Sequence, residues 1–303
     1  MGYADFKSKM KSSDNKETLA SAFEEKSYTD ARYWKPTIDK NGNASCVIRF
    51  LPAGGDEELP YVTIYSYAFQ DPKTQQWYIE NSLQTIGLED PIAQKNFELW
   101  QTGDELNRDI VRKRRRIQKF VANVLIIKDP AQPDLEGQVK LYKFGKAILN
   151  KIKEAIKPQF PDDPSINPFH PWEGADFRLR IFKDASNGYP SYEKCVFDAP
   201  SVVCDGDDTR IEEEIFMNLI PLSPEIAPDK FKTYAKLVER FALVTGSATK
   251  PAAPANDVNE DYTEKPKPKQ ETPKQEAPTE PSFSDDEPEM DPELMKLLQE
   301  DDD

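Results

Sequence analysis

The sequence predicts a mainly β body with a few helices, followed by an acidic segment that cannot form a core. Residues 247–303 hold 17 acidic residues, 6 basic residues and nine prolines, so this segment carries −11 of the chain's net charge of −15. All but two of the aromatic residues precede position 247. Only the first 246 residues can therefore bury enough apolar surface to fold, and short apolar runs bounded by turn residues dominate them.

The strands are predicted by short apolar runs that stop at Pro, Gly or Asp clusters. Lys40–Asn43 contains Asn-Gly, which favours a type I′ turn, so we expect a hairpin between strands at 33–38 and 46–51. Further strands are predicted at residues 61–69, 77–79, 120–127, 140–144 and 177–182.

The helices are predicted by apolar residues spaced three or four positions apart. The run 145–157 places three isoleucines on one face and stops at Pro158. The run 228–245 ends at Gly246, a residue typical of helix C-caps. Residues 88–107 and 207–219 are the other predicted helices.

The composition excludes several classes of protein. The chain has no run of 18 apolar residues and no recognisable signal peptide, so we expect a soluble, intracellular protein without a membrane partner. Three cysteines make no disulfide framework, and His170 is the only histidine, which argues against catalytic triads. The stretch Cys204–Asp208 looks metal-like, but its spacing does not match a calcium loop.

The sharpest functional signal is the basic stretch at residues 108–119. It holds seven basic residues against Asp109 alone, within a body that is only mildly acidic. Like charges repel, so the favoured interpretation is a polyanion that neutralises them and releases its counterions. A solvated helix face, arginines paired to acids elsewhere, and a nuclear localisation signal are the alternatives.

Aromatic residues in or beside the predicted strands are the second signal. Bases of single-stranded nucleic acid stack on such rings, at about 1–3 kcal/mol per base. Each ring taken singly is more often a core residue, but two tyrosines in the turn-rich loop 188–192 are better placed for contact. The rings are Tyr65, Tyr67, Trp77, Tyr78, Trp100, Phe120, Tyr142, Phe144, Tyr189 and Tyr192.

The acidic C-terminal segment is the third signal. We expect its Pro-rich first part to be disordered, and residues 294–298 to form a short apolar helix face for a partner protein. Its negative charge can also compete with nucleic acid for the basic stretch. A purely solubilising tail is the alternative.

Several strings occur in a fixed order, which is far more specific than any one of them. They are Trp34–Asp39, Gly42-Asn43, Val47–Pro52, Trp77–Glu80, Ala122-Asn123, Lys128–Pro130, Phe144–Lys146 and Pro171–Ala175. Together they resemble the single-stranded DNA-binding proteins of T-even-type bacteriophages, the helix-destabilising gene 32 protein family. The resemblance covers nearly the whole chain. It implies a basic N-terminal arm at 1–25, an OB-fold core at 26–246 and an acidic regulatory tail at 247–303.

The resemblance implies a protein that coats single-stranded DNA cooperatively, without sequence preference and without catalysis. Its setting would be phage DNA replication, recombination and repair in the cytoplasm of the infected bacterial host. Self-association along the strand would use the arm residues Lys9, Lys11, Ser12 and Ser13, and the tail would recruit replication and recombination proteins. A single-stranded RNA-binding translational regulator is the alternative function, and a nuclease is a further class.

Most candidate DNA contacts follow from aligning these strings with the family. The basic stretch and the rings themselves add Tyr78, Arg112 and Lys113. The complete set is Arg49, Tyr78, Trp100, Arg112, Lys113, Arg114, Arg115, Arg116, Phe120, Tyr142, Tyr189 and Tyr192.

The chain also departs from the family that it resembles. The type member holds zinc through one histidine and three cysteines, and these positions fall on Tyr67, Ser82 and residues 90–93, where no such ligand occurs. We therefore expect no zinc and no other cofactor. Apolar packing should replace the stabilisation that the metal supplies, from Tyr67, Ile86, Leu88 and Ile92.

Overall fold

The computed structural model describes residues 30–160, 162–184 and 188–247. Nine strands in these residues form one sheet of order β1-β6-β5-β2-β7-β8, in which β3 pairs with β4 and β5, and β9 pairs with β7. The predicted mainly β fold with helices is confirmed, while its OB-type closure stays a prediction. The strands are β1 Tyr33–Trp34, β2 Ala44–Phe50, β3 Tyr61–Gln70, β4 Trp77–Asn81, β5 Arg116–Lys128, β6 Val139–Phe144, β7 Ala175–Lys183, β8 Pro190–Ser191 and β9 Val196–Pro200.

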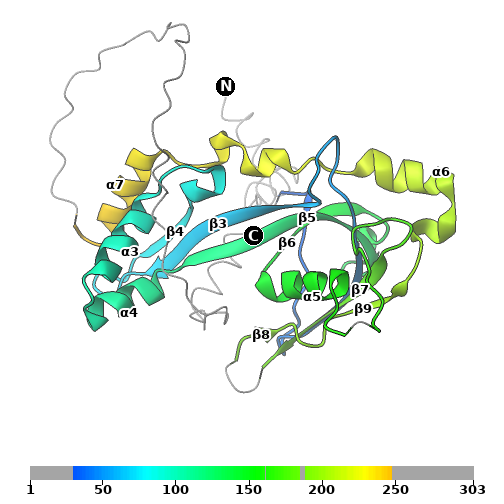
Figure 1. Ribbon diagram of the computed structural model, residues 1–303, viewed down its shortest axis with the longest axis horizontal. Helices are drawn as coiled ribbons and strands as arrows, with labels where there is room; N and C mark the ends of the chain where they lie inside the picture. The colour runs from blue at the N-terminus through cyan, green and yellow to red at the C-terminus, as the bar shows by residue number, and fades with distance from the viewer. Residues whose placement is uncertain (1–29, 161, 185–187, 248–303) are drawn as a thin grey trace, which may run out of the picture.

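The helices α3, α4 and α7 gather at one end of the molecule, and α5 lies beside the strands of the other part (Figure 1). No helix of the described residues is long and apolar enough to cross a membrane. The α-helices are α3 Pro91–Gln101, α4 Glu105–Lys113, α5 Lys146–Ile156, α6 Asp208–Arg210 and α7 Tyr234–Val244. Short helical turns are η1 Leu83–Ile86, η2 Pro133–Leu135, η3 Val203–Gly206, η4 Ile211–Ile215, η5 Phe216–Asn218, η6 Ser223–Ile226 and η7 Pro228–Lys230.

The long strand β5 joins two lobes of unequal size (Figure 1). Its first half pairs antiparallel with β3, and its second half pairs with β2, while β6 runs along the other edge. We call β4, η1, α3, α4, α7 and the adjoining ends of β3 and β5 the small lobe. The remainder, centred on β2, β5, β6, β7 and α5, is the main lobe.

The core of the main lobe lies between the sheet and α5. The ring of Phe50 is at its centre, with centroids of Phe144, Phe169 and Phe177 at 5.5 to 5.7 Å. The apolar face predicted for α5 adds buried Ile148, Leu149 and Ile152 to this core, whereas Ile156 at the end of the helix is exposed.

A turn forms at Asn41-Gly42, but neither the predicted type I′ geometry nor the hairpin does. A type I′ turn needs a positive φ at both central residues, and only Gly42 of the pair has one. Asp39 N–H donates to the Asn43 carbonyl, and Gly42 adopts a positive φ of 81°. However, β1 pairs in parallel with β6 and not with β2. Trp34 accounts for the difference, because its buried indole N–H donates at 2.9 Å to Asp129, just beyond the end of β5. A buried Trp requires such a partner, and this one draws β1 toward β6.

Local backbone chemistry divides two of the predicted helices. The single helix expected at 88–107 is the pair α3 and α4, separated at Gly103, whose φ is 72°. The helix expected at 207–219 is a series of short turns, α6, η4 and η5. The last helix is shorter than predicted, since Thr233 caps it and Gly246 follows it with φ 66°. The sequence did not predict β8 or β9.

The chain after η5 returns to the small lobe, where α7 packs against α3 and β4 (Figure 1). Asn123, which is fully buried in β5, holds this returning segment. Its side-chain amide donates to the Ile220 carbonyl at 2.8 Å, and its side-chain oxygen accepts the Ile220 N–H at 3.1 Å. The segment 219–222 is thereby fixed to the centre of the sheet.

Candidate nucleic-acid interface

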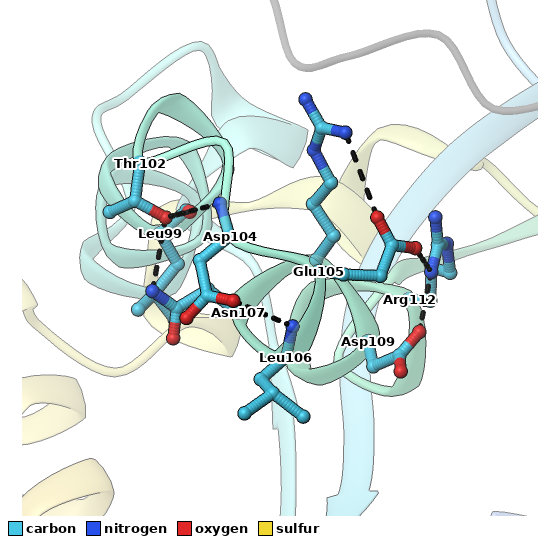
Figure 2. Close-up of polar contacts among 9 residues, drawn as sticks. Leu99, Thr102, Asp104, Glu105, Leu106, Asn107, Asp109 and Arg112 are labelled. Atoms are coloured by element: carbon cyan, nitrogen blue, oxygen red, sulfur yellow. Dashed lines mark hydrogen bonds and ion pairs between the residues drawn. The ribbon is translucent and has the colours of Figure 1, made fainter.

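The basic stretch begins on α4, and the turn after α3 determines where this helix starts (Figure 2). Asp104 caps α4 by accepting a 3.2 Å hydrogen bond from the N–H of Leu106. The Thr102 hydroxyl donates to the Leu99 carbonyl at 2.7 Å and accepts from the Asn107 amide at 3.0 Å. These bonds join the end of α3 to the first turn of α4, so the position of α4 follows from that of α3.

Acidic residues of α4 already pair with two of its arginines (Figure 2). Glu105 lies 2.7 Å from Arg112 and 3.7 Å from Arg108, and Asp109 also pairs with Arg112. Exposed pairs of this kind contribute about 0–1 kcal/mol each, so a phosphate can replace the carboxylates at little cost. Lys113 is exposed at the end of the same helix. Arg112 and Lys113 therefore remain suitable phosphate contacts.

Arg114 points into the small lobe. Its guanidinium lies 3.3 Å from the Asp71 carboxylate and packs against the rings of Phe69 and Phe241, at 5.1 and 5.2 Å from their centroids. Burial lowers the pKa of Arg114, and the nearby Asp71 offsets part of that effect. Asp71 in turn accepts the N–H of Thr74. Arg114 thus joins the end of α4 to the β3–β4 turn and α7, and its predicted contact with phosphate stays a prediction.

Arg116 opens β5 on the same face of the sheet as Tyr65. Its guanidinium carbon lies 4.1 Å from the centroid of the Tyr65 ring, and its Nη1 donates a 2.6 Å hydrogen bond to the Gln84 side chain. Arg115, Arg116 and Tyr65 are half-buried. We call Tyr65, Gln84 and Arg116 the β3–β5 platform. It lies at the small-lobe end of β3 and β5, beside η1.

Two members of this platform are absent from the contacts predicted by sequence. Tyr65 is one of the strand rings noted above, but nothing in its spacing distinguishes it from its neighbours. Gln84 gives no sequence signal, because its place depends on the short turn η1. Strand alternation puts Tyr65 on the face opposite to Ile64, but Tyr67 shares that face, so alternation alone does not single out Tyr65.

Arg49 is a core residue, which corrects the predicted DNA contact. Its side chain is 0 % exposed, lies 3.2 Å from Asp176 and donates to the carbonyls of Ser201 and His170 at 2.6 and 3.1 Å. Burial lowers the pKa of Arg49, against the opposing effect of Asp176. β2 is paired with β5 along one edge and with β7 along the other, and its last three residues are buried. Arg49 therefore holds β2, β7 and two loops together.

Three predicted aromatic contacts, Tyr78, Phe120 and Tyr142, are also core residues, so these predictions are wrong. Tyr78 stacks on Phe69 with the ring centroids 5.1 Å apart. Phe120 and Tyr142 lie in the core of the main lobe, where each is close to the ring of Phe144. Rings enclosed in this way have no face left for a base. Each of the three rings is instead a core residue, which is the commoner role of a single aromatic residue in a strand.

The remaining candidate rings are half-buried and lie in different parts of the molecule. Trp100 is on α3, with the guanidinium of Arg108 5.3 Å from its ring centroid. Tyr189 and Tyr192 flank β8, which lies apart from α4 and the small lobe (Figure 1). Tyr192 also packs against the main core. Their contact with bases stays a prediction. The arm residues Lys9, Lys11, Ser12 and Ser13, and the tail from residue 248, lie outside the described residues.

The residues at the family's zinc positions do not fit a zinc ion. Ser82 and Asp90 are buried and bonded to each other at 2.9 Å, and Asp90 also accepts the N–H groups of Leu83, Ile92 and Ala93. This carboxylate is occupied in capping α3, and no thiolate or imidazole lies beside it. Within residues 30–160, 162–184 and 188–247, no three His, Cys, Asp or Glu side chains are grouped so as to hold a metal.

Apolar packing around these positions follows the prediction in part. Tyr67 and Ile92 are buried in one cluster with Phe69 and Tyr78. Ile86 packs against a neighbouring cluster. Leu88 is 56 % exposed, so its predicted place in the packing is wrong.

Comparison with known proteins identifies the family of the chain. The family described as "gp32 DNA binding protein like" matches residues 40–245. The chain belongs to this family. Its relatives include the single-stranded DNA-binding proteins of Enterobacteria phage T2, 36% identical over 233 residues, and Enterobacteria phage T4, 35% identical over 233 residues. Each match covers 75% of this chain and 74% of the relative. The family resemblance that the sequence predicts is confirmed.

Arg114 points into the small lobe whereas Arg112 is exposed, so their replacement should affect the free energy of unfolding differently. Arg114→Ala should lower the free energy of unfolding by about 3–5 kcal/mol, because it leaves the buried Asp71 carboxylate without its cation. Arg112→Ala, two positions away on α4, removes only exposed pairs and should leave the free energy of unfolding nearly unchanged. Urea unfolding of the whole chain measures both. Equal losses in the two variants would contradict the inward role of Arg114.

Proposed function

We propose that the chain binds single-stranded DNA cooperatively and without sequence preference, in phage DNA replication, recombination and repair inside the host cell. The observation that carries this proposal is its membership of the family over residues 40–245, together with relatives named as single-stranded DNA-binding proteins. The β3–β5 platform and the exposed end of α4 supply the two kinds of contact that such binding needs. The proposed role is binding and not catalysis.

The proposed binding combines charge with stacking. Arg112, Lys113 and Arg116 meet phosphates, and the counterions that these phosphates release make affinity fall steeply with salt. Half-buried rings offer faces to bases without reading their edges, which accounts for the absence of sequence preference. Because the protein binds the single strand and not the duplex, it lowers duplex stability by mass action.

Titration with poly(dT), poly(U) and duplex DNA across a salt series tests the function. Tryptophan fluorescence should report tight, salt-sensitive binding to poly(dT), weaker binding to poly(U) and none to duplex, and the recovered DNA should be intact with magnesium present. Removing both charges in Arg112→Ala, Lys113→Ala should reduce the slope of log affinity against log salt by about 0.7 per lost phosphate contact. Equal affinity for duplex DNA would refute the proposal, and preference for poly(U) would favour the RNA-binding alternative.

The two chain ends are proposed to regulate this binding. The arm, with Lys9 and Lys11 beside Ser12 and Ser13, contacts the next copy along the strand, and the tail competes with DNA and recruits replication and recombination proteins. The support is a difference in local charge: residues 247–303 are net −11, whereas residues 1–13 hold Lys7, Lys9 and Lys11 against Asp5 alone.

Deleting residues 1–25 should abolish cooperative binding to long poly(dT) and spare affinity for a short oligonucleotide. Deleting residues 247–303 should tighten or accelerate binding, because the competing negative charge is lost. Binding isotherms at low salt measure both effects. A truncated arm that leaves cooperativity intact, or a truncated tail that leaves binding unchanged, would contradict the corresponding role.

We further propose that the small lobe is ordered without a metal. The support is the Asp90 carboxylate, which accepts bonds from Ser82 and three backbone N–H groups where the family's type member has zinc ligands. The purified protein should contain no stoichiometric zinc, and a chelator should leave its melting temperature unchanged. Asp90→Ala should destabilise it by about 1–3 kcal/mol through loss of these bonds. Stoichiometric zinc, or melting that a chelator lowers, would overturn the proposal.

A further inference from the structure

The β3–β5 platform holds the guanidinium of its arginine over an aromatic ring. A distance of 4.1 Å between the guanidinium carbon of Arg116 and the Tyr65 ring centroid is a stacking distance. The 2.6 Å hydrogen bond from Arg116 to Gln84 fixes the guanidinium from its edge. An arginine that serves only as a positive charge needs neither contact, because a flexible side chain reaches a phosphate equally well.

The support beneath the platform is rigid on both sides. The Ser82 N–H donates to the Tyr65 carbonyl, and the Tyr65 N–H donates at 2.9 Å to the Thr85 hydroxyl. The Gln84 N–H donates at 3.3 Å to the Ser82 hydroxyl, which caps η1. The turn that positions Gln84 is thus bonded to the strand that carries Tyr65. Tyr65 and Gln84 are therefore held by one network.

We propose that the stacked pair of Tyr65 and Arg116 is a binding site for a nucleobase, with Arg116 presenting the plane of its guanidinium as well as its charge. The proposal rests on the proposed function and adds a specific site to it. A base of the single strand lies against the pair, because guanidinium planes and aromatic rings both stack on bases. Gln118, a half-buried polar residue, lies opposite Tyr65 in the ladder and on the same face of the sheet.

The experiment compares a thymine oligonucleotide with one of equal length whose residues are all abasic, which keeps the phosphates and removes the bases. The variants are Arg116→Lys, which keeps the charge and loses the plane, and Tyr65→Val, which loses the ring in a strand-compatible way. Arg210→Lys on α6 is the matched control, because Arg210 pairs with a carboxylate and lies outside the platform. Thermal melting establishes that each variant is folded.

Arg116→Lys and Tyr65→Val should each weaken binding to the thymine oligonucleotide by about 5- to 100-fold, with the salt slope unchanged. Neither should alter the weaker binding to the abasic oligonucleotide. Tyr65→Phe, which keeps the ring, should lose less than Tyr65→Val, and Arg210→Lys should bind as the unmodified chain does.

Two results would overturn this inference while leaving the proposed function in place. One is unmodified protein that binds thymine and abasic oligonucleotides equally. The other is an Arg116→Lys variant that keeps full affinity for the thymine oligonucleotide, which would make Arg116 a phosphate contact only. Failure of the unmodified protein to bind any single strand would instead reject the proposed function.

Discussion

The hydrogen-bond ladder between β3 and the first half of β5 is the constraint on which the rest of the structure depends. It runs from Tyr61 opposite Ala122 to Tyr67 opposite Arg116. The second half of β5 is held in the main lobe by β2 and β6, so this ladder alone carries the sheet into the small lobe. A slip of one residue would move Tyr65 and Arg116 to opposite faces and separate the platform.

Burial sorts the arginines of this acidic chain into two kinds. Arg49 and Arg114 are enclosed, each beside one carboxylate, and they join strands, loops and helices. Arg112 pairs with carboxylates on an exposed helix, where a stronger anion can replace them. Charge therefore serves stability at some positions and is available to a ligand at others. A basic run in the sequence does not distinguish these uses, because its residues belong partly to a helix and partly to a strand.

The sequence was informative where local chemistry decides the outcome. Short apolar runs predict β3 and β6, and isoleucine spacing predicts α5. Local sequence patterns were insufficient where contacts with residues distant in the chain determine the placement of an element. The bond from Trp34 to Asp129 draws β1 away from its expected hairpin, and nothing near Trp34 in the chain predicts it. Likewise, an aromatic ring in a strand can stack on a base or pack in a core. Strand pairing and neighbouring rings place Tyr78, Phe120 and Tyr142 in the core.

A single strand bound on the β3–β5 platform should lie in direct contact with Tyr65 and Arg116. Photo-cross-linking of the whole protein to an oligonucleotide that carries a photoreactive thymine analogue, followed by mass spectrometry of the peptides, tests it most directly. Cross-links should form to the peptides that contain Tyr65 and Arg116. They should disappear when unlabelled poly(dT) competes. Cross-links confined to α6, η4 and η5, at the far end of the main lobe, would contradict it (Figure 1).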